Sequence, residues 1–308
     1  MKVLITGASG MVGRNLVSIL SKKKYHLLTP PRSQLNLLDY SNIENYLLME
    51  KPDFIIHAAG RVGGIQANIS APLEFYLENL EMGKNLIVAA RKAGILRVLN
   101  LSSSCIYPPD RENSLVETDL LSGGLEKTNE GYALAKLSII KLCEYLSLQD
   151  KKFEYKTIIP CNLYGRYDKF DESVSHMIPA VIKKIHNAKM QKLNEVEIWG
   201  DGTVRREFMY VEDLARLIEK CILEYDNLPQ LMNIGLGYDY SINDYYQIIA
   251  EIIGYDGEFK YVLDKPVGMK RKLLNVNRMK SFDWVANTTL EDGIRKTYQY
   301  FLELNGGK

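Results

Sequence analysis

Residues 2–13, KVLITGASGMVG, decide the fold of this chain. The segment opens with a short apolar run typical of a buried strand, and Gly7, Gly10 and Gly13 follow in a GxxGxxG spacing where a helical pattern begins. Glycine in such a turn lets the backbone approach a pyrophosphate, and the helix N-terminus presents free N–H groups. We therefore expect a dinucleotide-binding turn. The alternative is an ordinary tight turn with close helix–strand packing.

Strand and helix patterns alternate from this segment up to about residue 165. Continuous apolar runs predict strands that are buried on both faces, and the intervening segments have the apolar spacing of helices. Strands are expected at 2–7, 26–30, 53–60, 97–107 and 155–165, and helices at 11–23, 39–51, 72–94 and 132–150. This alternation predicts an α/β fold with a Rossmann-type, doubly wound parallel sheet.

The pattern becomes less regular beyond residue 165, which predicts a second, smaller domain. Helices are expected at 175–189 and 242–254, and a strand–turn–strand–helix segment over 196–222. We expect residues 1–164 to form the Rossmann domain, with a returning segment at about 207–240, and residues 165–206 and 241–308 to form a mixed α/β substrate-binding domain.

Composition excludes several classes of function. Lys and Arg total 39 and Asp and Glu total 38, a net charge of +1, which lacks the basic excess of proteins that bind nucleic acids or anionic membranes. No apolar run reaches the ~18 residues of a transmembrane helix. The four cysteines and four histidines show no CxxC or HExxH spacing. We expect no nucleic-acid, membrane or metal partner, and a reducing, cytoplasmic setting.

The end of the second strand indicates which cofactor binds. NAD(H) normally needs an acidic residue there to hold the ribose 2′-hydroxyl, whereas HLLTPPRSQLNLLD (26–39) has no acid at the strand end and contains Arg32. A guanidinium suits a 2′-phosphate by its charge and its forked donors. We therefore expect NADP(H), with Asn36 and Leu37 beside the adenine. The alternative is that Arg32 is a solvated surface charge.

A second motif supplies acid–base chemistry. Tyr132 and Lys136 lie four residues apart in YALAK, and therefore on one helix face. The ammonium is expected to lower the pKa of the phenol, and the Ser103 hydroxyl at the fourth strand's end can hold a carbonyl oxygen. The three side chains are expected to polarise a C=O group, donate a proton and orient the nicotinamide, as in a reductase.

Several segments extend these motifs over nearly the whole chain, in the order GMVG, LNLLD, RVGGI, SSCIYP, TNEGYALAK, KLCEY, NLYG, SHMIPA, WGDGTVRREF and RKLL. Together they resemble the extended short-chain dehydrogenase/reductases that act on nucleotide sugars. Within these, the chain is similar to the GDP-L-fucose synthases, which are GDP-4-keto-6-deoxymannose 3,5-epimerase/4-reductases. The resemblance implies an NADPH-dependent C4 reductase with C3/C5 epimerase activity on a GDP-4-keto-6-deoxy sugar, working as a homodimer.

Cys105 and His176 are the residues that this resemblance adds. Cys105 lies two residues after Ser103, so on a continuing strand its thiol would face the same cleft, and His176 begins the predicted helix of the smaller domain. A C4 ketone acidifies the protons at C3 and C5, and inversion needs a base on one face and an acid on the other. By resemblance, Cys105 is the base and His176 the acid. The alternatives are a small buried cysteine and a histidine that only caps a helix.

The resemblance also implies further contacts. For the cofactor these are Ser9, Met11, Val12, Ala58, Ala59, Leu101, Pro160, Asn162 and Leu163, with Lys136 and His176 serving it as well. For the substrate they are Ser104, Asn162, Lys184, Trp199 and Arg206. Lys272 is a further cation expected near the diphosphate, and the alternative is that it is a solvated basic residue. Trp199 would meet the guanine, and the cations would neutralise the diphosphate.

At some positions this sequence differs from the residues that are usual in the GDP-L-fucose synthases. Ser9 replaces a frequent Arg, Gly131 a frequent Pro, Tyr210 a frequent His and Val267 an acidic residue. These changes leave the nicotinamide chemistry intact but leave the sugar open, and a 6-deoxy-heptose also fits. Three other functions remain: a C4 reductase that follows a separate epimerase, a 4,6-dehydratase, and a regulatory module that senses NADP(H). A dehydratase would typically carry an Asp–Glu pair where SSSCIY stands.

Overall fold

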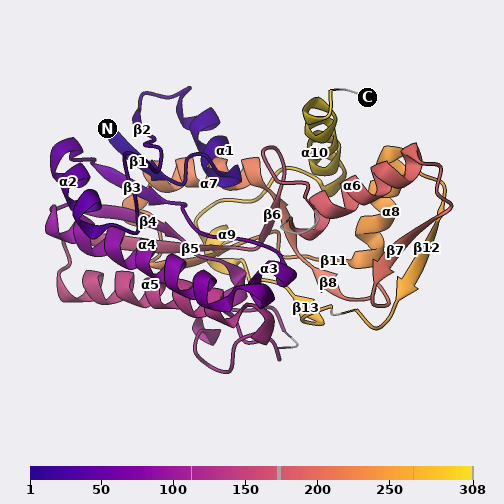
Figure 1. Ribbon diagram of the computed structural model, residues 1–308. Helices are drawn as coiled ribbons and strands as arrows, with labels where there is room; N and C mark the ends of the chain where they lie inside the picture. The colour runs from indigo at the N-terminus through magenta and orange to yellow at the C-terminus, as the bar shows by residue number, and fades with distance from the viewer. Residues whose placement is uncertain (112, 172–174, 266, 307–308) are drawn as a thin grey trace.

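A computed structural model describes residues 1–111, 113–171, 175–265 and 267–306. Two bodies of unequal size make up the chain (Figure 1). The larger is built on a six-stranded sheet, and the smaller contains α6 (Met177–Met190), α8 (Ile242–Ile253) and α10 (Leu290–Leu304). The chain passes between the bodies more than once, so both contain segments that are distant in sequence.

The large sheet is parallel throughout, with the strand order β10-β5-β4-β3-β1-β2. Its strands are β1 (Lys2–Thr6), β2 (His26–Leu28), β3 (Phe54–His57), β4 (Arg97–Leu101), β5 (Glu154–Pro160) and β10 (Leu231–Ile234). Because β2 and β3 lie on opposite sides of β1, the winding reverses at β1. Ligands of doubly wound sheets bind at the carboxyl ends of strands beside such a reversal.

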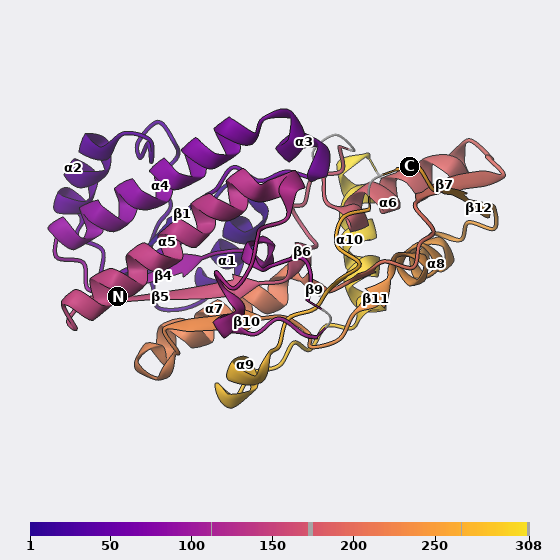
Figure 2. The ribbon, with the colours of Figure 1, turned by 90° about the horizontal axis from the view of Figure 1, so that it is seen from below.

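Helices cover both faces of this sheet (Figure 2). α2 (Tyr40–Glu50), α4 (Pro72–Lys92) and α5 (Glu130–Gln149) lie on one face, and α1 (Met11–Leu20) and α7 (Val211–Leu223) on the other. Alternation along β1 produces the two layers: Leu4 faces the core shared with α2 and α4, whereas Val3 and Ile5 face the core shared with α1 and α7. The doubly wound α/β fold expected from the sequence is confirmed.

The smaller body has a separate core, in which α6, α8 and α10 pack around aromatic side chains such as Tyr164 and Tyr245. Its strands form short ladders. β6 (Asn162–Tyr164) pairs with β9 (Phe208–Tyr210), β7 (Glu195–Trp199) with β12 (Glu258–Val262), and β8 (Arg205–Arg206) with β11 (Tyr240–Ser241) and β13 (Arg271–Lys272).

The division between the bodies differs in part from the expected one. α7 and β10 return to the large sheet, as the segment 207–240 was expected to do. The segment around α9 (Asn277–Ser281) also returns, because Leu274 and Met279 lie in the core of the large sheet. The sequence assigns this segment to the smaller domain, since a five-residue helix has little periodic signal. The expected division of function, with the cofactor bound by the larger body and the substrate by the smaller one, remains a proposal.

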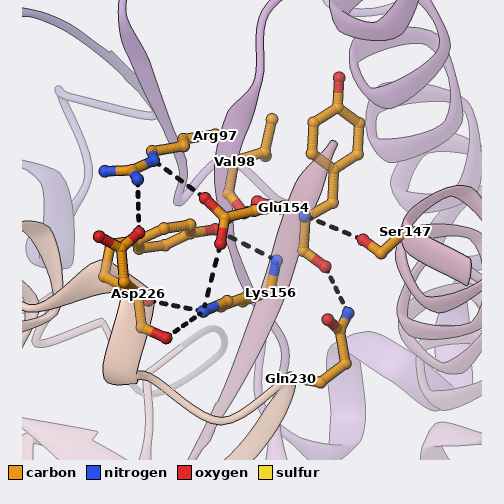
Figure 3. A network of polar contacts seen from close by, with 9 residues as sticks. Arg97, Val98, Ser147, Glu154, Lys156, Asp226 and Gln230 are labelled. Carbon is orange, nitrogen blue, oxygen red and sulfur yellow. Dashed lines mark hydrogen bonds and ion pairs between the residues drawn. The ribbon is translucent and has the colours of Figure 1, made fainter. Parts of the chain in front are cut away.

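A polar network lies at the amino-terminal edge of the large sheet, away from the glycine turn (Figure 3). Lys156 donates to the carbonyl of Tyr225 at 2.6 Å, and the Tyr225 hydroxyl donates to a backbone carbonyl of β4 at 2.6 Å. Arg97 joins Glu154 to Asp226. Burial lowers the pKa of Lys156, and these partners replace its lost hydration. The network ties β4 and β5 to the chain that follows α7.

Candidate active site

A cavity of about 1130 Å³ runs along the carboxyl ends of the large sheet and continues against the smaller body. All residues expected to contact cofactor or substrate line this cavity except Ser104. Ser104 does not line it, because β4 ends at Leu101 and the chain turns into a 3₁₀ helix, Ser104–Ile106, that buries its side chain. Its expected contact with the substrate stays a prediction.

The glycine turn after β1 fits a pyrophosphate. Gly7 has a φ of +72°, and a Cβ atom there would lie 2.7 Å from the backbone of Ala59. A Cβ atom at Gly13 would lie 2.2 Å from the carbonyl oxygen of Gly7, so α1 packs against the turn only without a side chain. Gly10 caps α1 with no side-chain hydrogen bond, which leaves N–H groups of the first turn for an anion.

The loop after β2 forms the part of the cavity wall where the adenosine of the cofactor is expected. β2 ends at Leu28, and Asn36, Leu37 and the exposed Arg32 line the wall that follows. Arg32 is the only charged residue among the described lining residues of the segment 29–38. Its position suits a 2′-phosphate at the open rim.

Tyr132, Lys136 and Ser103 meet at the centre of the cavity, where α5 faces the end of β4. Burial raises the pKa of Tyr132, the Cys105 thiol beside it acts in the same direction, and a hydrogen bond with Ser103 opposes the shift. The expectation that Lys136 lowers this pKa is wrong for the free protein, because burial of the phenol dominates. The phenol is therefore protonated at neutral pH.

Lys136 lies below the ring of Tyr132, with Nζ 5.9 Å from the ring centroid. Nζ donates to the carbonyl of Leu101 at 3.1 Å, which fixes the ammonium at the end of β4. Burial lowers the pKa of Lys136 to about 8. It remains mostly charged at pH 7, as its expected contact with a ribose requires.

Cys105 faces the cavity beside Ser103, although not because of strand alternation. It lies in the 3₁₀ helix capped by Ser103, and its N–H donates to Ser103 Oγ at 3.5 Å. The half-buried sulfur lies 3.8 Å from Lys272 Nζ. Lys272, expected at the diphosphate, therefore contacts the thiol.

His176 is the N-cap residue of α6 and makes no side-chain cap. Its ring lines the cavity from the side of the smaller body. Burial, with a smaller contribution from Lys272, lowers its pKa to about 4. The expectation that this imidazole titrates near neutral pH is wrong for the free protein, in which it is neutral at pH 7.

Residues of the smaller body make basic the part of the cavity wall where the nucleotide of the substrate is expected. Trp199 is 41% exposed at the rim, and Arg206 donates to the carbonyl of Val267 at 2.8 Å. Burial lowers the pKa of Arg206 to about 10, so the guanidinium stays charged. Lys184 donates to the carbonyl of Glu197 at 2.9 Å. This charge suits a diphosphate.

The Val267 side chain packs against the turn after β7, since a Cβ atom at Gly200 would lie 2.4 Å from Val267 Cγ1. Both Val267 and Trp199 line the cavity, so Val267 is a neighbour of the residue expected to meet the guanine.

Sequence reasoning missed several polar residues of the cavity wall. Asn68 Oδ1, Ser102 Oγ, Asn129 Oδ1 and Ser175 Oγ are buried without a partner within the described residues, and each residue lines the cavity. Glu126 lines it as well. Asn129 lies within the quoted segment TNEGYALAK, so the motif contained a signal that was not used. Unpartnered buried atoms are available to hold ligand hydroxyl and amide groups.

Comparison with known proteins agrees with this geometry. Residues 3–235 match the model of the NAD dependent epimerase/dehydratase family. The chain belongs to this family. It is 55% identical to a GDP-L-colitose synthase of Yersinia pseudotuberculosis over 302 residues, covering 98% of each chain. It is 45% identical to a GDP-L-fucose synthase of Azorhizobium caulinodans, covering 99% of this chain and 97% of the relative. The resemblance stated from the motifs is thereby confirmed.

A solved structure has the same fold. The GDP-mannoheptose C4 reductase from Campylobacter jejuni, with NADP bound, superposes with a TM-score of 0.88 at 28% identity. The alignment covers 97% of this chain and 98% of the reductase. In the part of the chain that the structure describes, no helix is long and apolar enough to span a bilayer, and no cluster of three potential metal ligands occurs.

Proposed function

We propose that the protein reduces the C4 ketone of a GDP-4-keto-6-deoxy sugar with NADPH and epimerises the sugar at a carbon next to the ketone. The observation that carries this proposal is one continuous cavity. It joins a glycine turn, the Ser103–Tyr132–Lys136 set, the Cys105–His176 pair and the basic residues of the smaller body.

Reduction uses residues of the larger body. When bound, NADPH supplies the hydride for C4. The Ser103 hydroxyl holds the C4 oxygen, and the protonated Tyr132 donates the proton that turns this oxygen into a hydroxyl. Lys136, held by the carbonyl of Leu101, binds the ribose and orients the nicotinamide ring toward the sugar.

Epimerisation uses Cys105 and His176 from opposite walls of the cavity. The Cys105 thiolate takes a proton from the carbon next to the ketone, and the electron pair moves onto the C4 oxygen as an enolate. His176 returns a proton to the opposite face. The neutral imidazole must first gain a proton, which the negative charge of a bound diphosphate favours.

The name of one relative supports the choice of sugar that we propose. L-Colitose is L-fucose without the C3 hydroxyl, and the 55% identical relative is named for colitose. We infer a 3-deoxy substrate, for which inversion at C5 alone sets the product. The two substrates are distinguished by measuring kcat/KM with the GDP-4-keto-6-deoxy sugar and with its 3-deoxy counterpart. A kcat/KM at least ten-fold higher for the 3-deoxy sugar is expected, and the reverse order would assign the fucose-type substrate.

Reduction without epimerisation is the second candidate function. It is favoured by the low pKa of His176, which leaves the free protein without a ready acid on that face. A GDP-mannoheptose C4 reductase is also among the structural neighbours. A heptose substrate reduced with no solvent proton in the product would support this alternative.

Arg32→Ala is expected to weaken NADPH binding ten- to a hundred-fold and NADH binding far less. The reason is the loss of a charge-assisted contact to the 2′-phosphate, worth about 1.5–3 kcal/mol. Calorimetric titration with both cofactors measures the difference. Arg14→Ala is the control, since this exposed arginine stacks on Tyr167 at 3.8 Å and does not line the cavity. Equal losses for both cofactors would remove Arg32 from the 2′-phosphate site.

A homodimer is expected, formed through α4 and α5. These helices lie side by side and expose apolar side chains, including Leu73, Leu77, Leu134, Tyr145 and Leu148. Light scattering is expected to give twice the chain mass of 35.2 kDa, and the double variant Leu77→Glu, Leu148→Glu to give single chains. A wild-type particle of one chain mass at micromolar concentration would contradict the dimer.

A further inference from the structure

Lys272 occupies an unusual position for a residue expected to bind a diphosphate. Its Nζ lies 3.8 Å from the Cys105 sulfur, although the two residues are 167 positions apart in sequence. Both side chains are partly buried and both line the cavity. The ammonium also contributes to the lowered pKa of His176, so it is near both groups proposed for epimerisation.

Two cations stand side by side on the strands that carry Lys272. β13 pairs in parallel with β8, and in this register Lys272 is opposite Arg206. Like charges directly opposite each other on neighbouring strands are destabilising. Among the described residues neither side chain has an ion pair within 4.0 Å, and Glu126, which lines the cavity, acts on Arg206 from farther away.

The neighbouring cations on the same two strands, Arg205 and Arg271, differ because they have a carboxylate partner. Arg205 and Arg271 both pair with Asp239, at 2.7 and 2.6 Å. Asp239 is 7% exposed, so both cations on the outer face of the ladder share a carboxylate partner within the protein. Only the pair on the inner face is left for a ligand or for the thiolate.

The backbone around Lys272 is fixed on both sides. Arg205 N–H donates to the carbonyl of Lys270 at 3.0 Å, and Leu274 N–H donates to the buried Glu207 carboxylate at 3.0 Å. Glu207 also accepts from the N–H of Gly237 at 2.8 Å. A short strand held in this way presents its side chain in a defined direction, as a positioning role requires.

We propose that Lys272 is the positioning residue of the epimerisation step: its ammonium holds Cys105 as a thiolate directed at the sugar, while Arg206 and Lys184 serve the diphosphate. The cations near the thiol are Lys272 and Arg206, and the carboxylate of Glu126 lines the same cavity and acts on Arg206. Tyr132 and His176 are further titratable residues of this cavity. The proposal rests on the proposed function for the step it serves. An opposite charge within 4–6 Å of an ionisable group favours its charged form.

Alkylation of Cys105 tests the contact without any sugar. The other three cysteines are buried, so iodoacetamide reports on Cys105, and the modified peptide is quantified by mass spectrometry. Lys272→Met is expected to slow alkylation at pH 7 about ten-fold or more and to leave the rate at pH 10.5 unchanged. Lys272→Arg is expected to restore the rate at pH 7. Lys270→Met is the matched control, because Lys270 is exposed on the same segment and does not line the cavity.

A second readout separates positioning from diphosphate binding. In D₂O with a saturating GDP-4-keto sugar, Lys272→Met is expected to lower the ratio of deuterium exchange to hydride transfer about ten-fold. A raised KM with unchanged alkylation and an unchanged ratio would overturn the proposal and assign Lys272 to the diphosphate. If wild type exchanged no deuterium while Lys272→Met still slowed alkylation, the epimerase function would fail and the control of the thiol would stand.

Discussion

Tyr132→Phe is expected to lower the rate of C4 reduction by about 10²–10⁴-fold. The change removes the hydroxyl that donates a proton to the C4 oxygen and keeps the ring that packs against Phe75, whose centroid lies 6.4 Å away. Burial keeps the wild-type phenol protonated in the free protein, so the loss is expected throughout the neutral pH range. NADPH oxidation under saturating GDP-4-keto sugar measures the effect.

The control for Tyr132→Phe is Tyr145→Phe on the same helix. Tyr145 is 63% exposed and does not line the cavity, so its activity is expected to match wild type. The affinity of Tyr132→Phe for NADPH is expected to stay within a few-fold of wild type, since Lys136 and the glycine turn are unchanged. Turnover of Tyr132→Phe within a few-fold of wild type would disprove its role as proton donor.

Cys105→Ser is expected to stop deuterium from entering the sugar next to the ketone, with a loss of at least a hundred-fold. A serine hydroxyl is nearly isosteric but far too weak an acid to form the needed anion at pH 7. A substrate that is already epimerised is still expected to be reduced, because Ser103, Tyr132 and Lys136 remain. The measurement is mass spectrometry of product made in D₂O.

Two further variants are needed to interpret the result for Cys105: a control cysteine and the proposed acid. Cys161→Ser is the matched control, because this cysteine also lines the cavity but is nearly fully buried and has no assigned role. His176→Asn is expected to impair epimerisation as well, either in rate or in the configuration of the product, since the acid acts on the opposite face. Undiminished exchange in Cys105→Ser would show that the thiol only shapes the pocket.

The parts of this site that rest on local pattern could be predicted from the sequence. The glycine spacing after the first strand and the four-residue spacing of Tyr132 and Lys136 both depend on chain geometry over a few residues. The structure brings both motifs to one cavity. Gly131 was noted only as a departure, and its reason is now clear: a Cβ atom there would lie 2.6 Å from the carbonyl oxygen of Pro72, where α4 meets α5.

The parts that depend on tertiary packing could not be predicted. Lys272 meets Cys105 only because β13 pairs with β8 in a defined register, which no local pattern encodes. The neutral state of His176 follows from its burial between the two bodies. The burial of Ser104, expected to contact the substrate, follows from the chain leaving the extended conformation after Leu101 and turning into a 3₁₀ helix.

Product analysis of the wild-type protein in D₂O tests the proposed activity most directly. The protein is incubated with NADPH and, in separate samples, the GDP-4-keto-6-deoxy sugar and its 3-deoxy counterpart, and the product is examined by NMR and mass spectrometry. We expect one NADPH oxidised per product, a hydrogen at C4 delivered from the cofactor, and deuterium with inverted configuration at C5. The absence of NADPH oxidation with every GDP-4-keto sugar would contradict the reductase assignment, and reduced product without deuterium would contradict the epimerase assignment.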